Sequence, residues 1–161
     1  MNSIGEMLRK EEQSVAIAES VTGGLLQFAF SSAEEAKDFF QGGITAYNLG
    51  QKVRHLNLDP IRGEKTDCVS SSTAVVIATS CSESFISDWG IGVTGYASPY
   101  PERSVEKIFA FFAIVYKGKK ICCEKIVPPD GIDPETAKYF YVNQVIAMFE
   151  NILKNNHTPL K

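Results

Sequence analysis

The sequence predicts an α/β fold in which a mixed sheet carries helices on both faces. Up to Gly95, apolar runs of strand length alternate with amphipathic segments of helix length, a pattern typical of parallel strands joined by helices. Two later apolar runs, 107–116 and 119–127, are joined by Lys117-Gly118, and this two-residue connection predicts an antiparallel hairpin. We therefore expect a mixed, mostly parallel sheet with an antiparallel hairpin toward its C-terminal end.

The length and composition are those of one globular domain. The chain has 161 residues, 44% of them hydrophobic, and no low-complexity tract divides it. We expect a single domain over residues 1–161, with about seven disordered residues at the C-terminus. The net charge is −3 and the basic residues are scattered, which argues against binding to nucleic acid or to a membrane surface. A small solute is the expected partner.

Neither targeting nor metal binding is indicated by local patterns. No segment resembles a signal peptide or a membrane span, so we expect a cytoplasmic protein. The cysteines lack the CxxC spacing and the nearby histidines of zinc sites, so we expect reduced thiols, no metal and no other cofactor. These cysteines are Cys68, Cys81, Cys122 and Cys123. The two histidines, His55 and His157, argue against a histidine-based triad, because His157 lies in the polar tail.

The patterning of the first half of the chain predicts three helices and two strands. A stripe of Ile4, Met7 and Leu8 predicts a helix over 4–12, and the apolar run 15–18 predicts a strand. Thr22 and two glycines then begin an apolar segment that we expect to be helical to residue 30. The β-branched and aromatic residues of 42–48 predict a second strand, and Asn48 is a suitable cap for a helix over 49–56.

The second half begins with a turn-rich segment over 59–67. Ser70 is expected to cap a long helix that ends near Phe85, and 90–95 is expected to be a buried strand that ends in a small-residue turn. The prolines of 96–106 predict a loop before the hairpin. Asp133-Pro134 is expected to start the last helix. Its predicted inner face consists of Phe140, Gln144, Met148, Phe149 and Ile152.

The turn after the first strand is the first candidate binding site. The amides that begin the next helix have no intrahelical partner, and the helix dipole adds partial positive charge there, so an anion is favoured. Gly23 and Gly24 would let a ligand approach the backbone, and the hydroxyls of Ser20 and Thr22 could cap the helix or contact that ligand. The alternative is a capped helix without a ligand.

Three segments are expected to meet at the carboxyl ends of the parallel strands, where α/β sheets bind ligands. They are 19–24, Tyr47-Asn48 with Lys52, and 94–97. A neutral Lys52, its pKa lowered by burial, could take a proton from Ser20 or from water, and this chemistry would suit amide hydrolysis without histidine. The alternative is that Lys52 is a solvated residue on a helix surface.

These motifs together resemble the C-terminal domain of the CinA family (competence- and damage-inducible protein A). The resemblance runs from Ile4 to the last helix and is carried by four strings in the family's order. They are Ala-Ile-Ala-Glu-Ser-Val-Thr-Gly-Gly at 16–24, Gly-Gly-Ile-Thr-Ala-Tyr-Asn at 42–48 with Lys52, Val-Ser at 69–70 and Gly-Val-Thr-Gly at 92–95. The resemblance implies a three-layer α/β/α sandwich. It also implies, for active members, an amidohydrolase that converts nicotinamide mononucleotide into nicotinate mononucleotide and ammonia in pyridine-nucleotide salvage.

The resemblance also suggests roles for individual residues. Ser20 would be the nucleophile or would orient water, Lys52 would be the base, and Thr94 with the amides after Thr22 would stabilise the oxyanion. Substrate contacts are expected from Glu19, Thr22, Gly23, Gly24, Tyr47, Asn48, Gly95 and Ala97. The expected partner is a small-molecule nucleotide, and a homo-oligomer is a candidate assembly because the family tends to self-associate.

Two parts of the family's pattern are missing from this chain. Relatives continue Thr-Gly-x-Ala-Gly-Pro into a glycine-rich loop, whereas 94–102 reads Thr-Gly-Tyr-Ala-Ser-Pro-Tyr-Pro-Glu. Relatives also carry arginines near the last helix that suit phosphate, and here no arginine follows Arg103. Losing such a contact costs about 1.5–3 kcal/mol, and Arg103 is the candidate replacement. The alternative function is a catalytically silent member that binds a nucleotide or a protein partner.

Overall fold

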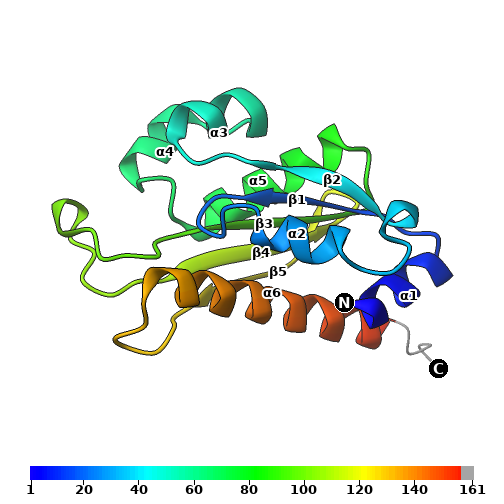
Figure 1. Cartoon of the computed structure of the whole chain (residues 1–161). Coiled ribbons are helices and arrows are strands. Elements are labelled where there is room, and N and C mark those ends of the chain that lie inside the picture. The colour runs from blue at the N-terminus through cyan, green and yellow to red at the C-terminus, as the bar shows by residue number, and fades with distance from the viewer. Residues whose placement is uncertain (157–161) are drawn as a thin grey trace.

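The computed structural model describes residues 1–156 and contains one five-stranded sheet between two layers of helices (Figure 1). The elements in order are α1 (Asn2–Lys10), β1 (Val15–Glu19), α2 (Leu25–Ser31), the 3-10 turn η1 (Ala36–Asp38), β2 (Phe40–Thr45), α3 (Leu49–Leu56), α4 (Pro60–Lys65), α5 (Ser71–Ser84), β3 (Trp89–Gly95), the 3-10 turn η2 (Pro101–Arg103), β4 (Ala110–Tyr116), β5 (Lys119–Ile126) and α6 (Pro134–Asn156). The predicted α/β/α sandwich is confirmed.

The strands lie in the order β2-β1-β3-β4-β5. Strand β1 is parallel to both β2 and β3, whereas β4 is antiparallel to both β3 and β5. Strand β5 therefore runs in the same direction as β1, β2 and β3, and only β4 is reversed. The mixed, mostly parallel sheet and its hairpin are both as predicted. The arrangement places the carboxyl ends of β1, β2 and β3 together at one edge.

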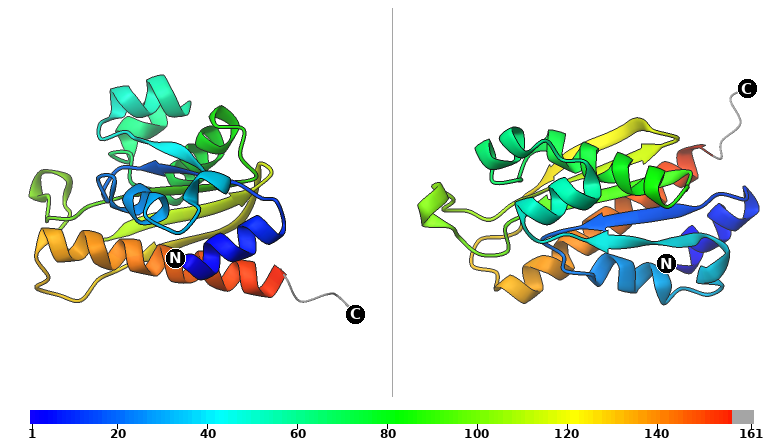
Figure 2. Two further views of the ribbon diagram at one scale, coloured as in Figure 1. Left: turned by 45° about the vertical axis from the view of Figure 1, so that its right-hand side comes forward. Right: turned by 90° about the horizontal axis from the view of Figure 1, so that it is seen from above.

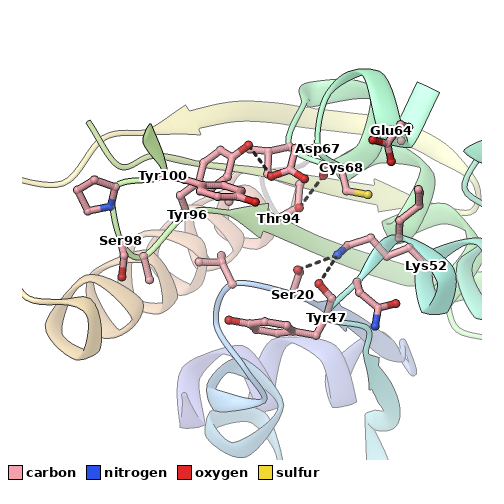
Figure 3. Close-up of a pocket in the computed structure, with 18 residues that line it drawn as sticks. Ser20, Tyr47, Lys52, Glu64, Asp67, Cys68, Thr94, Tyr96, Ser98 and Tyr100 are labelled. Atoms are coloured by element: carbon pink, nitrogen blue, oxygen red, sulfur yellow. Dashed lines mark hydrogen bonds between the residues drawn. The ribbon is translucent and has the colours of Figure 1, made fainter. Parts of the chain in front are cut away.

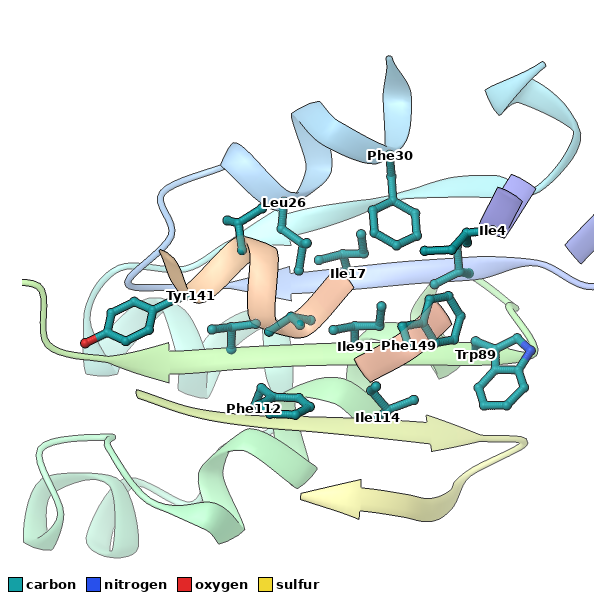
Figure 4. Packing of buried hydrophobic residues seen from close by; sticks show 14 of the residues in the cluster. Ile4, Ile17, Leu26, Phe30, Trp89, Ile91, Phe112, Ile114, Tyr141 and Phe149 are labelled. Atoms are coloured by element: carbon teal, nitrogen blue, oxygen red, sulfur yellow. The ribbon is translucent and has the colours of Figure 1, made fainter. Parts of the chain in front are cut away.

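The two faces of the sheet bury different side chains. Helices α1, α2 and α6 cover one face, and α5 covers the other with α3 and α4 beside it (Figures 1 and 2). In β1, Val15 and Ile17 point into the larger core under α2 and α6, and Ala16 and Ala18 point toward α5. Figure 4 shows the larger core, to which α2, β3, β4 and α6 contribute aromatic rings and β1 contributes Ile17.

Helix α5 packs closely on β3 because the strand presents glycine on that face. A Cβ atom on Gly90 would lie 2.3 Å from the carbonyl oxygen of Ala78, and one on Gly92 would lie 2.4 Å from that of Ala74. Any side chain at these two positions would therefore push the helix away. The close packing fixes β3, and with it Thr94 at its carboxyl end, against the start of α5.

Several elements differ from the sequence-based expectation, including β2, which spans Phe40–Thr45 rather than 42–48. The turn-rich segment 59–67 contains helix α4, which begins with Pro60 and is capped by Asp59, whose carboxylate accepts from the amide of Arg62 at 2.8 Å. Helix α2 begins at Leu25 rather than Thr22, because Gly23 and Gly24 adopt positive φ and form a turn. Strand β4 begins at Ala110 rather than Lys107.

Helix α6 is longer than predicted, and its inner face agrees with the prediction in part. It continues through Asn156, so residues 155 and 156 are helical rather than part of a tail, and His157 and the remaining tail lie outside the described residues. Gln144 is exposed, contrary to the prediction. Of the other predicted residues, Phe149 is buried, and Phe140, Met148 and Ile152 are partly buried and pack against the core. The remaining buried residues of the helix are Ala137, Tyr141, Val142, Val145 and Leu153. No helix within residues 1–156, α6 included, is both long and apolar enough to cross a bilayer.

Candidate active site

A cavity of about 460 Å³ opens at the carboxyl ends of β1, β2 and β3, where the sequence predicted a ligand site (Figure 3). This size is in the range that holds a small ligand. Its lining residues are Ser20, Val21, Tyr47, Asn48, Leu49, Lys52, Gly63, Glu64, Asp67, Cys68, Val69, Thr94, Gly95, Tyr96, Ala97, Ser98, Pro99 and Tyr100. Tyr96 and Tyr100 form part of its wall and leave the cavity open.

The hydroxyl of Ser20 and the amine of Lys52 meet inside this cavity. The amide of Ser20 donates to the carbonyl of Val93 at 3.0 Å, which extends the β1–β3 pairing by one residue and fixes the serine at the end of the strand. Lys52 Nζ lies 2.9 Å from Ser20 Oγ and 3.1 Å from the carbonyl oxygen of Tyr47. Lys52 is only 2% exposed, so it is not the solvated surface residue of the alternative interpretation.

The environment of Lys52 favours its neutral form. Burial lowers the pKa of this amine below the ordinary lysine value of 10.5, although Cys68 and Asp67 act in the opposite direction. Lys52 also lies in the first turn of α3, whose N-terminal amides disfavour a cation. A neutral Lys52 can accept the proton of Ser20 while it donates to the Tyr47 carbonyl, so the pair is arranged for proton transfer.

The start of helix α2 differs most from the sequence-based expectation. The Glu19 carboxylate is 0% exposed and accepts hydrogen bonds from the amides of Gly24, Leu26 and Gln27 at 3.1, 3.1 and 2.8 Å. Because the chain supplies its own anion here, these amides are not open to a ligand phosphate or oxyanion. Glu19 and Gly24 therefore have a structural role at this turn and do not line the cavity, and their predicted substrate contacts stay predictions.

Thr22, Gly23 and Arg103 also lie outside the cavity lining, and their predicted substrate contacts stay predictions. The Thr22 hydroxyl is buried and has no hydrogen-bond partner among the described residues. The Arg103 guanidinium lies 3.1 Å from a carboxylate oxygen of Glu64 and 3.8 Å from one of Asp67. Glu64 and Asp67 both line the cavity, whereas Arg103 does not line it and only pairs with their carboxylates.

Thr94 lines the cavity, but its hydroxyl already donates a hydrogen bond within the protein. Its hydroxyl donates to the carbonyl oxygen of Cys68 at 2.8 Å, so it cannot also donate to an oxyanion in this conformation. Asp67 and Cys68 both have positive φ, at 49° and 58°, a strained conformation for residues other than glycine. Thr94 therefore holds this strained turn against the end of β3. Cys68, like the other three cysteines, is a free thiol.

A sequence model of the CinA C-terminal domain matches residues 1–153. The chain belongs to the CinA family. A CinA-like protein of the cyanobacterium Picosynechococcus is 37% identical over 105 residues, which are 65% of this chain and 25% of that protein. The present CinA domain thus spans about a quarter of the length of such relatives. Protein MG115 of Mycoplasma genitalium is 36% identical over 118 residues, covering 73% of this chain and 75% of that protein.

The fold is shared with solved CinA superfamily structures. A Klebsiella pneumoniae member superposes with a TM-score of 0.88 over 96% of this chain and 95% of its own, at 20% identity. This likeness supports the architecture of the CinA domain and makes no statement about its ligand.

The CinA site contains both residues that were predicted from the sequence and residues that were not. Of the predicted residues, Ser20, Lys52 and Thr94 line the cavity together with Tyr47, Asn48, Gly95 and Ala97. Residues outside the predicted segments include Glu64 and Asp67, and the hydroxyl of Tyr96, from the predicted segment 94–97, donates to Asp67 at 3.1 Å. Asp59-Pro60, a capping residue followed by proline at the first helical position, was the available signal for α4 and hence for Glu64. No local pattern places Asp67 beside Tyr96.

Proposed function

We propose that this CinA domain hydrolyses the carboxamide of nicotinamide mononucleotide to give nicotinate mononucleotide and ammonia. The observation that carries this proposal is the 2.9 Å contact between Lys52 Nζ and Ser20 Oγ in a cavity of about 460 Å³. A serine paired with a buried, readily neutralised lysine is a known arrangement for attack on acyl groups. Family membership is consistent with this chemistry and does not by itself specify the substrate.

Acylation of Ser20 is the first half of the proposed reaction. Ser20 Oγ attacks the carboxamide carbon while its proton passes to Lys52 Nζ, and a tetrahedral intermediate forms. The C–N bond then breaks, and Lys52 returns the proton to the leaving nitrogen, which departs as ammonia. The product of this half is an ester between Ser20 and the nicotinate carbonyl.

Water completes the reaction. A water molecule attacks the ester carbon, Lys52 accepts its proton, and the proton passes to Ser20 Oγ as the C–O bond breaks. This step releases the carboxylic acid and restores the free serine and the neutral lysine. Lys52 thus acts as base and then acid in each half, and the Tyr47 carbonyl holds the amine in place throughout at 3.1 Å.

The backbone amide of Val21 is the proposed donor to the oxyanion. Val21 follows the nucleophile directly and lines the cavity, and its amide donates to no acceptor in the described part of the chain. An amide in this position serves the same purpose in hydrolases that carry the nucleophilic serine on a sharp strand-to-helix turn. This role replaces the one that the sequence suggested for Thr94.

The test is ammonia release from nicotinamide mononucleotide by the purified protein. We expect turnover in the wild type and a loss of about a hundredfold or more in Ser20→Ala and in Lys52→Met. Lys37→Met is the matched control, because Lys37 is an exposed lysine before β2 at the other end of the sheet. Folded wild-type protein that releases no ammonia would contradict the proposal, and so would variants that retain it.

A catalytically silent domain is the second candidate, and one observation weighs against the mononucleotide as a substrate. Among the described residues that line the cavity, Lys52 is the only basic one, and two acidic residues, Glu64 and Asp67, line it as well. A phosphate group gains little from such surroundings. Thermal stabilisation by nucleotides without any ammonia release would support this candidate.

A further inference from the structure

The charge of the cavity wall is negative when Lys52 is neutral. Glu64 and Asp67 contribute carboxylates, and Lys52 is the only basic residue among the described lining residues. The Glu64 side chain is 65% exposed and is therefore screened by water, whereas that of Asp67 is 31% exposed and acts on the cavity more strongly. The potential inside the cavity therefore favours a cation.

Arg103 offsets only part of this charge. Its guanidinium lies 3.1 Å from Glu64 and 3.8 Å from Asp67, so its shorter contact is with the more exposed carboxylate. The arginine itself does not line the cavity, and its side chain is 40% exposed. An ion pair exposed to this extent is weak, so Asp67 keeps much of its effect on a ligand.

Aromatic rings line the same side of the cavity. Tyr96 and Tyr100 have ring centroids 6.4 Å apart with an interplanar angle of 57°, so the two rings form an angled wall beside Asp67 (Figure 3). The Tyr96 hydroxyl donates to the Asp67 carboxylate at 3.1 Å, a contact that adds electron density to the ring. Burial is the main reason that the pKa of Tyr96 rises to about 12, so its phenol stays neutral.

We propose that Tyr96, Tyr100 and Asp67 are the residues with which this cavity discriminates a carboxamide on a positively charged aromatic ring from one on a neutral ring. The proposal rests on the proposed amidase function and names the residues that determine specificity at the same site. A nicotinamide whose ring nitrogen is bonded to a sugar has such a ring, because its pyridinium nitrogen carries a full positive charge. Electron-rich tyrosine rings and a carboxylate are the groups that attract it, and a neutral aromatic amide lacks this attraction.

Two probes of the same shape separate ring charge from every other feature of the ligand. The 1-methylnicotinamide cation and neutral 3-methylbenzamide both carry a carboxamide and a methyl group in meta positions, and neither has a phosphate. Their dissociation constants can be measured by ligand-observed NMR with the Ser20→Ala protein, which removes hydrolysis from the measurement. We expect the cation to bind about fivefold more tightly than its neutral counterpart.

Substitutions on the Ser20→Ala background test whether Asp67 and Tyr96 cause this preference. We expect Asp67→Asn, which keeps an acceptor for the Tyr96 hydroxyl, to reduce the preference to below about twofold. Asp38→Asn removes an exposed carboxylate at the far end of the sheet and should leave the preference unchanged. Tyr96→Leu should reduce it, whereas Tyr96→Phe, which retains the ring, should preserve most of it. The Tyr96 pair also keeps the test decisive if Asp67→Asn folds poorly.

Equal binding of the two probes would overturn the proposal, as would weaker binding of the cation or no binding of either at millimolar concentration. A preference for the cation that survives both Asp67→Asn and Tyr96→Leu would overturn the assignment to these residues. Because these measurements need no turnover, they are distinguishable from failure of the amidase proposal, which the ammonia assay detects separately.

Discussion

The carboxylate of Glu19 accepts a hydrogen bond of 2.8 Å from the amide of Gln27 and so joins the end of strand β1 to the first turn of helix α2. The amides of Gly24 and Leu26 donate to the same carboxylate. Because Ser20 directly follows Glu19, this buried connection also fixes the position of the proposed nucleophile. The Glu19 carboxylate at the N-terminus of α2 thus supports the proposed active site by fixing the position of Ser20, and it does not itself line the cavity.

Replacing Glu19 should therefore destabilise the fold. Glu19→Ala leaves three amides without their acceptor, and we expect a loss of about 3 kcal/mol in the free energy of unfolding. Glu19→Gln retains one oxygen acceptor and should lose about half as much. Urea denaturation measures both values. The exposed Glu35 provides the control, since Glu35→Ala should change stability by less than about 0.5 kcal/mol. A mild effect of Glu19→Ala would show that solvent replaces the carboxylate.

Lys52 should make activity depend on pH with a defined sign. The neutral amine is the base, and burial lowers its pKa below 10.5, so kcat/KM for ammonia release should rise with pH through this lowered value and level off above it. The midpoint of the rise must lie below 10.5. A pH profile of kcat/KM checks this expectation. A rate that falls as pH increases across the same range would show that the ammonium form of Lys52 is the active one.

The same residue should reduce stability at neutral pH. In the unfolded chain Lys52 binds its proton up to about pH 10.5, whereas in the folded chain it loses the proton earlier, so stability rises with pH across the interval between these two values. We expect Lys52→Met to be more stable than the wild type by about 1 kcal/mol below this interval. The difference should shrink as pH increases through it. Thermal unfolding at several pH values measures this, with Lys37→Met as the control.

Features that depend on local patterning were predictable from the sequence, and those that depend on tertiary contacts were not. The alternation of apolar runs and the two-residue connection at 117–118 were sufficient for the sheet and its hairpin. Proximity of Ser20 and Lys52 was also predictable, because both come after strands whose carboxyl ends must meet. The acceptor of the hydrogen bond from the Thr94 hydroxyl was not predictable, because Cys68 is brought to β3 only by the strained turn before α5.

The occupied N-terminus of α2 shows a second limit of local reasoning. A glycine-containing turn before a helix predicts free amides, and the same sequence string contains Glu19, whose side chain can reach back to them. Strand alternation alone would point this side chain to one face of the sheet and says nothing of its partners. Whether a helix N-terminus is open to a ligand or closed by the chain is therefore decided by side-chain conformation rather than by residue spacing.

Helix α6 supports the aromatic wall from the opposite face of the sheet. The Tyr141 hydroxyl donates to the carbonyl oxygen of Tyr96 at 2.9 Å, and Tyr141 is fully buried. Tyr141→Phe should cost about 1 kcal/mol in unfolding free energy and weaken binding of the 1-methylnicotinamide cation about twofold, because Tyr96 loses its anchor. Tyr139→Phe, at a half-exposed position on the same helix, should change neither quantity. Loss of stability with unchanged binding would mean that this anchor does not position the Tyr96 ring.

Arg103 should affect cationic and anionic substrates in opposite directions. Its charge lies next to Glu64 and Asp67 at the cavity, so Arg103→Ala makes the potential there more negative. We expect kcat/KM for nicotinamide riboside, a cation, to rise about twofold and that for nicotinamide mononucleotide, which adds a phosphate, to fall about twofold, since the arginine is partly exposed and screened. Arg54→Ala removes an exposed charge from α3 and controls for net charge. A fall by about tenfold or more that is specific to the mononucleotide would instead show that Arg103 leaves its carboxylates and binds the phosphate directly.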